Sequence, residues 1–228
     1  MTTRIFGSGI RRREDPRLMT GQAAFTDDIK LLGLLHAAIL RSPHAHAKIN
    51  SIDTSAARAA PGVLAVYTGA DTDGVLNPIP CAWLPPDSDI KAVPHPALAV
   101  DTVRYVGDGV AVVVAESRYQ AEDALELITV DYGVLPSVIN PKAAMDPGAP
   151  QLHEDAPNNQ AFHWVVAGGD ADAAFETAAG DPQNHVVVSE NIIQQRLIPH
   201  AVEPRSAIAN WQSAMAALTL CSATPTLP

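Results

Sequence analysis

The most constraining feature of the sequence is a run of alanine and valine from Ala111 to Ala115. A compact apolar run of this length predicts a buried strand. Ser117 follows it with Gln120 three residues later, a spacing typical of a capping box at the start of a helix. Thr129 to Tyr132 predicts the return strand. The helix between these strands has one apolar face, because apolar residues recur at helical spacing at Ala121, Ala124, Leu125 and Ile128.

Shorter elements are expected before this unit. Thr54 is placed to cap a short helix over Ser55 to Ala60, which ends at Pro61 and Gly62. Strands are predicted for Leu34 to Leu40, Lys48 to Asp53 and Val63 to Thr68. Strands and helices do not alternate strictly, so the sequence favours an α+β domain over a doubly wound parallel sheet.

The remaining segments differ in composition. Residues 77 to 96 are rich in proline and predict an extended surface loop. Residues 136 to 159 hold five prolines with several Asn and Asp, which indicates a linker with at most a short helix at its start. Beyond it we expect a short helix over Asp170 to Ala179, and strands over Val186 to Ile198, Ala207 to Trp211 and Leu218 to Cys221.

Composition excludes several classes of protein. With 47% hydrophobic and 18% charged residues, the 228-residue chain resembles a soluble globular protein. Its net charge of -10 argues against binding to nucleic acid or to an anionic membrane surface. No window approaches the roughly 18 apolar residues of a membrane span. The two cysteines form no CxxC pattern, so no disulfide framework or cysteine metal site is expected, and a cytoplasmic location fits.

Two patterns invite a binding-site interpretation. Gly7 and Gly9 resemble part of a dinucleotide loop, but Arg12 occupies the third glycine position, which favours a flexible leading segment. His44 and His46 would share one face of a strand, a geometry that a metal ion could use. No third ligand is visible nearby in the sequence. Ordinary half-buried histidines are therefore the favoured interpretation, and no metal ligand is assigned.

Charged residues suggest structural roles. Arg41 could pair with a carboxylate such as Asp53. Glu203-Pro204-Arg205 could hold an acid and a base rigidly, although an ion pair at a turn is favoured. Arg11 to Arg13 precede two acids and indicate a solvated turn rather than an export signal. No nucleophile elbow or phosphate loop is present, so the residues alone indicate an α+β protein without an assigned catalytic residue.

Longer motifs over residues 5 to 140 resemble those of one protein family, and they occur in the same order as in that family. They are Arg13 to Gly21, Leu40 to Ala47, Ala60 to Val63, Thr68 to Asp71, Val103 to Gly107, Ala111 to Glu116, Arg118 to Ala124 and Val130 to Tyr132. Together they resemble the α/β hammerhead domain that opens the large subunit of xanthine dehydrogenase, aldehyde oxidase and aerobic carbon monoxide dehydrogenase. Gln195-Arg196 through Arg205 resembles the opening of the molybdopterin-binding domain that comes next in the family.

The resemblance implies three regions. Residues 1–140 would form the hammerhead domain with an N-terminal arm, 141–160 a linker, and 161–228 an incomplete start of the molybdopterin-binding domain. In the full-length parent, a molybdopterin-type molybdenum cofactor would oxidise an aldehyde, a purine or carbon monoxide with oxygen from water. Electrons would pass to iron-sulfur and FAD-binding subunits, and a second large subunit would complete the complex.

One departure from the family bears on activity. Its first molybdenum-proximal residue is a glutamine in a Ser-Thr-Gln-like motif, whereas this chain reads Ser222-Ala-Thr224 and then Pro225. The resemblance therefore implies a truncated subunit, inactive alone, with no catalytic residue and no cofactor of its own; Glu203 and Arg205 keep a structural role. The alternative is a non-catalytic assembly module. We also expect poor order or self-association in the last third, where Val186 to Val188, Ile192, Ile193 and Trp211 lack packing partners.

Overall fold

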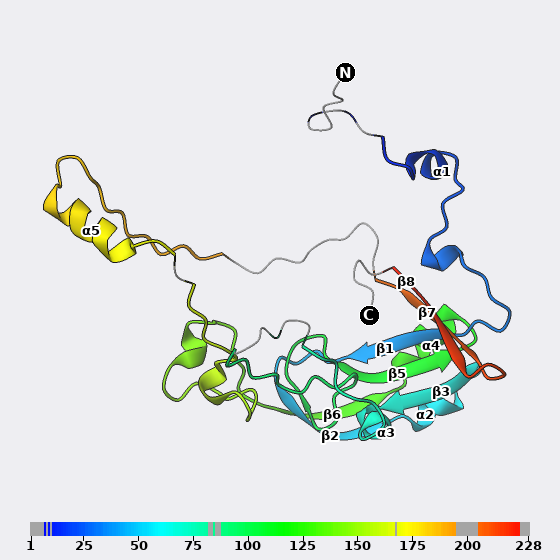
Figure 1. The fold of residues 1–228 in the computed structure, drawn as a ribbon. Coiled ribbons are helices and arrows are strands. Elements are labelled where there is room, and N and C mark those ends of the chain that lie inside the picture. Colours follow the sequence, from blue (N-terminus) through cyan, green and yellow to red (C-terminus); the bar gives the residue numbers. More distant parts are fainter. Residues whose placement is uncertain are drawn as a thin grey trace. The chain divides into compact units, whose positions relative to one another are not determined.

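The computed structural model describes residues 7, 9, 11–81, 84, 88–166, 168–194 and 205–223 (Figure 1). The chain divides into two compact units. The larger unit is Leu35–Val187, and the smaller unit combines Met1–Leu34 with Val188–Pro228. The larger unit contains the sheets and helices that the motifs predict.

The first sheet of the larger unit has the strand order β1-β5-β3. Its strands are β1 (His36–Arg41), β3 (Val63–Thr68) and β5 (Gly109–Ala115), and β5 pairs antiparallel with both neighbours. Five of the seven β5 residues are buried, which confirms the buried strand predicted at Ala111 to Ala115. Small branched and methyl side chains suit this central position because both faces of β5 are largely covered.

The second sheet has the order β4-β2-β6 and is also antiparallel. Its strands are β2 (Ala47–Asp53), β4 (Thr102–Val103) and β6 (Thr129–Val134). The register of β2 against β6 shifts between Ile49 and Ser51, as at a bulge. Strands and helices are mixed, and every strand pair among the described residues is antiparallel, so the expected α+β class is confirmed.

Helix α4 (Arg118–Leu125) begins where the sequence predicts. The Ser117 hydroxyl accepts the backbone N–H of Gln120 over 3.3 Å and donates to Gln120 Oε1 over 2.7 Å. Ala121 and Ala124 are buried on the helix face that packs against the first sheet. The strand-helix-strand unit predicted from residues 111 to 132 is therefore present.

Helix α2 (Ser55–Ala59) has the predicted position but a different cap. Thr54 occupies the N-cap position, yet its side chain accepts no helix N–H; it accepts the Nε–H of Arg58 over 2.9 Å instead. Asp53 Oδ1 accepts the backbone N–H of Ser55 over 2.9 Å. The predicted Thr54 cap is wrong because the carboxylate one residue earlier is the stronger acceptor.

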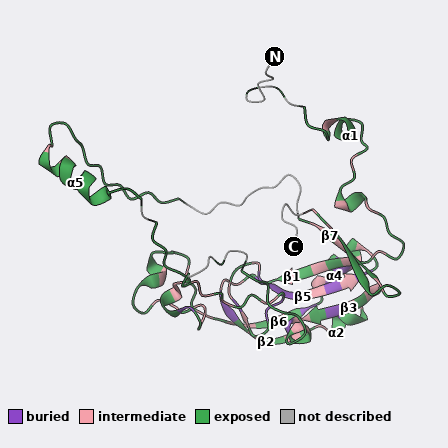
Figure 2. Ribbon diagram, viewed as in Figure 1, coloured by how far each residue is buried: buried purple, intermediate pink, exposed green. Residues whose placement is uncertain are grey.

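Two small hydrophobic cores lie within the larger unit, where the buried residues gather on the sheets in Figure 2. The first joins the β1-β5-β3 sheet to α2 and α4, and consists of Ala57, Val66, Ala111, Val113, Ala115, Ala121, Ala124 and Ile128. The second involves both sheets, and consists of Ala47, Ala99, Val103 and Val110. Helix α3 (Gly69–Thr72) lies beside the second core, where Gly69 approaches the backbone of Ala99 so closely that a Cβ would meet its carbonyl oxygen at 2.0 Å.

The proline-rich segment 77–96 has no helix or strand over its described residues, as predicted. It is held by backbone bonds, from Ile79 N–H to the carbonyl of His95 over 2.7 Å and from Lys91 N–H to the carbonyl of Ala161 over 2.8 Å. These bonds fix the loop to itself and to the segment that begins after residue 160.

Residues 141–160, which we call the Asn159 loop, have an organised interior. They include the short 3-10 turns η2 (Ala143–Met145) and η3 (Pro157–Asn159). The Asn159 side chain donates to the carbonyls of Ala144 and Pro150 over 2.9 Å each, and accepts the N–H of Leu152 over 2.9 Å. A segment with linker composition therefore has a hydrogen-bonded centre of its own.

Beyond this loop, α5 (Ala171–Gly180) confirms the predicted helix, and Asp170 Oδ1 accepts the N–H of Ala173 over 2.9 Å at its start. The strand predicted for Val186 to Ile198 is wrong over residues 186–194, which have no strand assignment. A strand needs a hydrogen-bonded neighbour, and no described residue pairs with this run. Residues 195–198 lie outside the described part of the chain.

The smaller unit contains α1 (Asp15–Met19), the 3-10 turn η1 (Thr26–Asp28) and a hairpin of β7 (Ala207–Gln212) with β8 (Ala217–Ser222). The hairpin confirms both predicted strands. Trp211 and Leu218 face each other on it and remain 61% and 58% exposed. Among the described residues of either unit, no helix is long and apolar enough to cross a membrane.

Candidate functional site

Polar side chains gather in the larger unit around the C-terminal end of β1 and the turn before β5. Ser42, His46 and Asp108 are the buried polar or charged residues of the described chain, at 2%, 8% and 9% exposure. Hydrogen bonds, ring contacts and electrostatic interactions join them to further polar residues. We call this set the polar cluster: Arg41, Ser42, His44, His46, His95, Arg104, Tyr105, Asp108, Tyr132 and His153.

Asp108 anchors the cluster through its backbone and its carboxylate. Its Oδ2 accepts the backbone N–H of Arg104 over 3.1 Å, and its own N–H donates to the carbonyl of Tyr105 over 3.2 Å. Ser42 N–H donates to the carbonyl of Asp108, and Gly107 N–H donates to the carbonyl of Ser42, over 2.8 Å each. Gly107 has a φ of 95°, which a residue with a side chain would adopt only under strain. The end of β1 is thereby fixed to the turn before β5.

Two tyrosines border Asp108. Burial raises the pKa of Tyr105, and the negative charge of Asp108 adds to this effect. The Tyr105 hydroxyl lies 3.2 Å from His95 Nε2. Burial also raises the pKa of Tyr132, while a hydrogen bond with Ser42 acts in the opposite direction. Both phenols are therefore held in the neutral form, in which they can donate hydrogen bonds.

The two histidines considered as metal ligands have separate structural partners. His46 Nδ1 donates to the carbonyl of Pro136 over 2.7 Å, and the His44 ring meets Tyr132 edge-on with centroids 4.9 Å apart. Both histidines precede β2, because the Ser42 hydroxyl accepts the N–H of His44 and bends the chain. The predicted shared strand face is wrong, and each histidine has a structural partner. The expectation that neither is a metal ligand stays a prediction.

The predicted pairing of Arg41 with Asp53 is also wrong. Arg41 Nη1 donates to the carbonyl of Gly107 over 2.9 Å. Asp53 accepts hydrogen bonds from the side chain and backbone of Ser55, which lower the pKa of its carboxyl group. Arg41 ends β1 and Asp53 ends β2, which belong to different sheets, so each finds a nearer partner.

Arg104 connects the polar cluster to the Asn159 loop. Its Nε donates to the carbonyl of Leu152 over 3.0 Å, and its Nη1 donates to the carbonyl of Thr102 over 3.3 Å. The neighbouring His153 is partly buried there. Burial lowers the pKa of His153, the charge of Arg104 lowers it further, and Asp155 opposes both.

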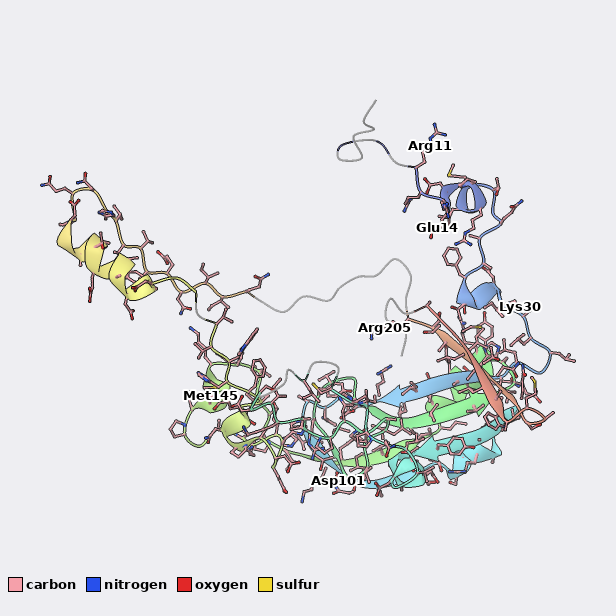
Figure 3. The ribbon with its side chains drawn as sticks, viewed as in Figure 1. Arg11, Glu14, Lys30, Asp101, Met145 and Arg205 are labelled. Carbon is pink, nitrogen blue, oxygen red and sulfur yellow. The ribbon has the colours of Figure 1, made fainter. Side chains whose placement is uncertain are left out.

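The other residues considered from the sequence belong to the smaller unit. Arg12 forms an exposed ion pair with Asp15 over 3.0 Å, and Arg11 and Glu14 are exposed beside α1 (Figure 3). Gly7 and Gly9 are exposed, and their immediate neighbours lie outside the described residues. Arg205 is exposed, whereas Glu203 and Pro204 lie outside the described residues, so their ion pair stays a prediction.

The buried members of the polar cluster form a structural hydrogen-bond network. Within the described residues, every buried side-chain nitrogen or oxygen has a hydrogen-bond partner. A group that is already satisfied offers no unmet donor or acceptor to a ligand. No sequence pattern pointed to Arg104, Tyr105, Asp108 or His153, because key partners such as Ser42 and Leu152 come from distant segments. The Val103 to Gly107 motif contains Arg104 and Tyr105 without indicating their contacts.

Comparison with known proteins identifies the fold. Residues 20–136 match the sequence model of the family described as aldehyde oxidase and xanthine dehydrogenase, a/b hammerhead domain. The chain belongs to this family. The resemblance found in residues 5 to 140 is therefore confirmed, and the two antiparallel sheets with α2 and α4 are its hammerhead domain.

Similarity extends over nearly the whole chain. The carbon monoxide dehydrogenase large chain of Afipia carboxidovorans is 37% identical over 95% of this chain and 27% of its own length. The nicotine 6-hydroxylase large subunit of Paenarthrobacter nicotinovorans is 37% identical over 93% of this chain and 25% of its own. The crystal structure of quinoline 2-oxidoreductase from Pseudomonas putida 86 matches with a TM-score of 0.79 and 36% identity, covering 96% of this chain and 27% of that one. The chain thus spans about a quarter of the length of these relatives.

No metal site is formed by the side chains of the described residues. Among them, no group of three or more His, Cys, Asp or Glu side chains is arranged to hold a metal ion. The buried polar side-chain atoms among them already have hydrogen-bond partners, most of them backbone groups. No chemical step is therefore assigned to the cofactor in this chain.

Proposed function

We propose that this chain is the opening part of the large subunit of a molybdenum hydroxylase-type oxidoreductase. The similarity to large subunits over nearly the whole chain, joined to the hammerhead match, is the observation that carries the proposal. In the full-length parent, the activity would be oxidation of an aldehyde, a purine or carbon monoxide. The hammerhead domain would serve as a scaffold, and the molybdenum cofactor would be held by other parts of the subunit.

The domain plan proposed for the chain has three regions. Residues 1–140 form the hammerhead domain with its N-terminal arm, residues 141–160 the connection, and residues 161–228 the start of a molybdopterin-binding domain. The similarity beyond residue 136 supports this plan, because relatives remain similar over 93% or more of the chain. The organised Asn159 loop makes the connection a folded segment, which fits a defined rather than a loose junction.

Reading the DNA beyond the codon for Pro228 tests whether the chain opens a larger subunit. Translation in all three frames is expected to give a continuation similar to the relatives, with a glycine-rich segment. If no frame gives such a continuation, the proposal for a larger parent is contradicted.

Metal analysis tests whether the 228-residue chain acts alone. The purified chain is expected to contain no stoichiometric molybdenum, and to reduce no dye acceptor with an aldehyde, a purine or carbon monoxide, because the described residues form no metal-binding group. Elemental analysis by mass spectrometry and a dye-reduction assay measure these properties. Stoichiometric molybdenum together with turnover would show that the chain is a complete catalyst.

A second candidate function is a non-catalytic assembly module. The two hydrophobic cores and the paired buried groups of the polar cluster favour it, because a domain with its own core can fold and bind without a cofactor. One relative is named as subunit gamma of the 6-hydroxypseudooxynicotine dehydrogenase complex. The partners proposed here are iron-sulfur and FAD-binding subunits and a second large subunit. Co-expression followed by size-exclusion chromatography tests this function, and separate elution of all components would contradict it.

A further inference from the structure

The Asn159 loop is attached to the hammerhead domain by a side chain that belongs to the polar cluster. Arg104 lies between β4 and β5, and its backbone N–H donates to Asp108 Oδ2 over 3.1 Å. Its Nε donates over 3.0 Å to the carbonyl of Leu152, inside the loop. One arginine therefore couples the turn before β5 to the loop.

The loop presents Leu152 to Arg104 as part of a cooperative set of bonds. Leu152 N–H donates to Asn159 Oδ1, and Gln151 Nε2 donates to the carbonyls of His153 and Ala156 over 2.6 and 2.5 Å. Asn159 adopts the left-handed backbone region with a φ of 55°, which costs free energy in a residue with a side chain. Because these bonds converge on residues 151 to 153, a disturbance at His153 reaches the acceptor of Arg104 directly.

Most of the charged or titratable groups around His153 disfavour a positive charge on its imidazole, because Arg104 is already positive. The groups that act on it are Arg104, His46 and His95 from the hammerhead side, and Asp155 from the loop itself. His46 Nδ1 donates to Pro136, and His95 Nε2 lies 3.2 Å from the Tyr105 hydroxyl. The single carboxylate is thus outnumbered by one permanent cation and two further imidazoles.

We propose that His153 is an acid-operated latch, whose protonation beside Arg104 releases the Asn159 loop from the hammerhead domain while both sheets stay folded. The docked loop holds His153 partly buried and near Arg104, and the released loop exposes it to water. Protonation therefore favours release, because a second cation is better solvated away from the arginine. The folded hammerhead domain does not depend on the latch, since its two cores lie in the sheets and helices.

The direction of the pH response follows from the docked environment. Burial and the charge of Arg104 lower the pKa of His153 below the ordinary value of 6.5. The docked loop therefore binds fewer protons than the released loop. Docking is fully favourable above pH 6.5 and weakens as the pH falls toward the lowered pKa.

Hydrogen exchange of the full chain, followed by mass spectrometry at pH 7.5 and pH 5.5, tests the latch. After correction for the intrinsic pH dependence of exchange, peptides from residues 141–160 are expected to lose protection several-fold at the lower pH. Peptides from β5 are expected to keep theirs. His153→Gln should remove the pH response of the loop, whereas the exposed His163→Gln should leave it intact. Equal protection of the loop at both pH values, or an undiminished response in a docked His153→Gln variant, would overturn the proposal.

An NMR titration decides the case in which His153→Gln releases the loop at every pH. The imidazole resonance of His153 is the one that is missing from the spectrum of the His153→Gln variant. This assignment holds whether or not the loop of that variant is docked. Its midpoint in the unaltered chain is expected below 6.5 and at the pH where loop protection falls. A midpoint at or above 6.5 would contradict the latch.

Discussion

Ser42 and Asp108 are joined through the backbone, with the N–H of Ser42 donating to the carbonyl of Asp108 over 2.8 Å. This bond holds the end of one edge strand against the turn that leads into the central strand. The Asp108 carboxylate extends the connection to Arg104 and so to the Asn159 loop. Asp108 therefore connects three segments, which are the end of β1, the turn before β5 and, through Arg104, the Asn159 loop.

Asp108→Ala is expected to lower the free energy of unfolding of the hammerhead domain by about 1–3 kcal/mol, because it leaves the backbone N–H of Arg104 without its acceptor. Urea denaturation followed by circular dichroism measures the change. Asp108→Asn keeps an acceptor oxygen and should cost less.

Removing the charge of Asp108 should also bring the pKa of Tyr105 back toward 10.0, which ultraviolet titration detects. An unaltered Tyr105 titration would show that Asp108 does not act on the phenol.

The central strand provides a matched pair of core substitutions. Val113 is fully buried against the α4 side of the sheet, while the adjacent Val114 is only partly buried on the opposite face. Val113→Ala is expected to lower the free energy of unfolding by about 2 kcal/mol through lost burial and a residual cavity. Val114→Ala should cost under about 1 kcal/mol. Equal losses in urea denaturation would mean that both faces of β5 are covered alike.

Gly69 offers a test of backbone packing at the start of α3. A Cβ there would lie 2.0 Å from the Ala99 carbonyl oxygen and 2.8 Å from the Val100 Cα, and neither backbone atom can move aside as a side chain can. Gly69→Ala is expected to cost about 1–3 kcal/mol or more in thermal or urea unfolding. Gly180→Ala is the control, because nothing lies within 4 Å of its Cβ position. A stable Gly69→Ala variant would show that α3 can shift away from Ala99.

Asp71 is expected to contribute to the loss of folding stability of the domain at low pH. The Thr68 backbone N–H and hydroxyl donate to its carboxylate over 2.7 and 2.9 Å, and together they lower its pKa below 3.8. The folded state therefore binds this proton less readily than the unfolded state. Its stabilising contribution is present above pH 3.8 and is lost as the pH falls below that value. Asp71→Asn should flatten this part of the stability profile, whereas the exposed Asp73→Asn should not.

Elements with a strong local pattern could be predicted from the sequence. The apolar run of β5 and the Ser117 cap of α4 are encoded within a few residues, and both are found in place. Strand β4 has two residues and exists only because Val103 pairs with Ala47. The predicted strand at Val186 fails for the reverse reason, since β propensity forms no strand without a partner.

The contacts within the polar cluster could not be predicted from the sequence for a similar physical reason. His46 has the spacing of a possible ligand, but its acceptor is the carbonyl of Pro136, 90 residues later. Ser42 and Asp108 meet only after β1 and β5 have paired. Contacts between distant segments follow from the fold, so spacing along the chain could show the residue types but not their partners.

Limited proteolysis of the full chain should separate the hammerhead domain and the Asn159 loop from the C-terminal third. Residues 185–194 have no helix or strand, and Val186, Val188 and Ile192 are 86%, 74% and 88% exposed, as expected for apolar residues without packing partners. The linker predicted over residues 136–159 would place the trimming limit toward that segment. The Asn159 side chain is hydrogen-bonded to both Ala144 and Pro150, which stabilises the loop. The C-terminal end of the resistant fragment is therefore expected just after residue 160, near the exposed Phe162. Mass spectrometry of a subtilisin digest should show a resistant fragment ending there, with Asn159→Ala moving the limit back toward residue 136. Protease resistance throughout residues 161–228 would mean that this region is protected, by self-association or by packing of its own.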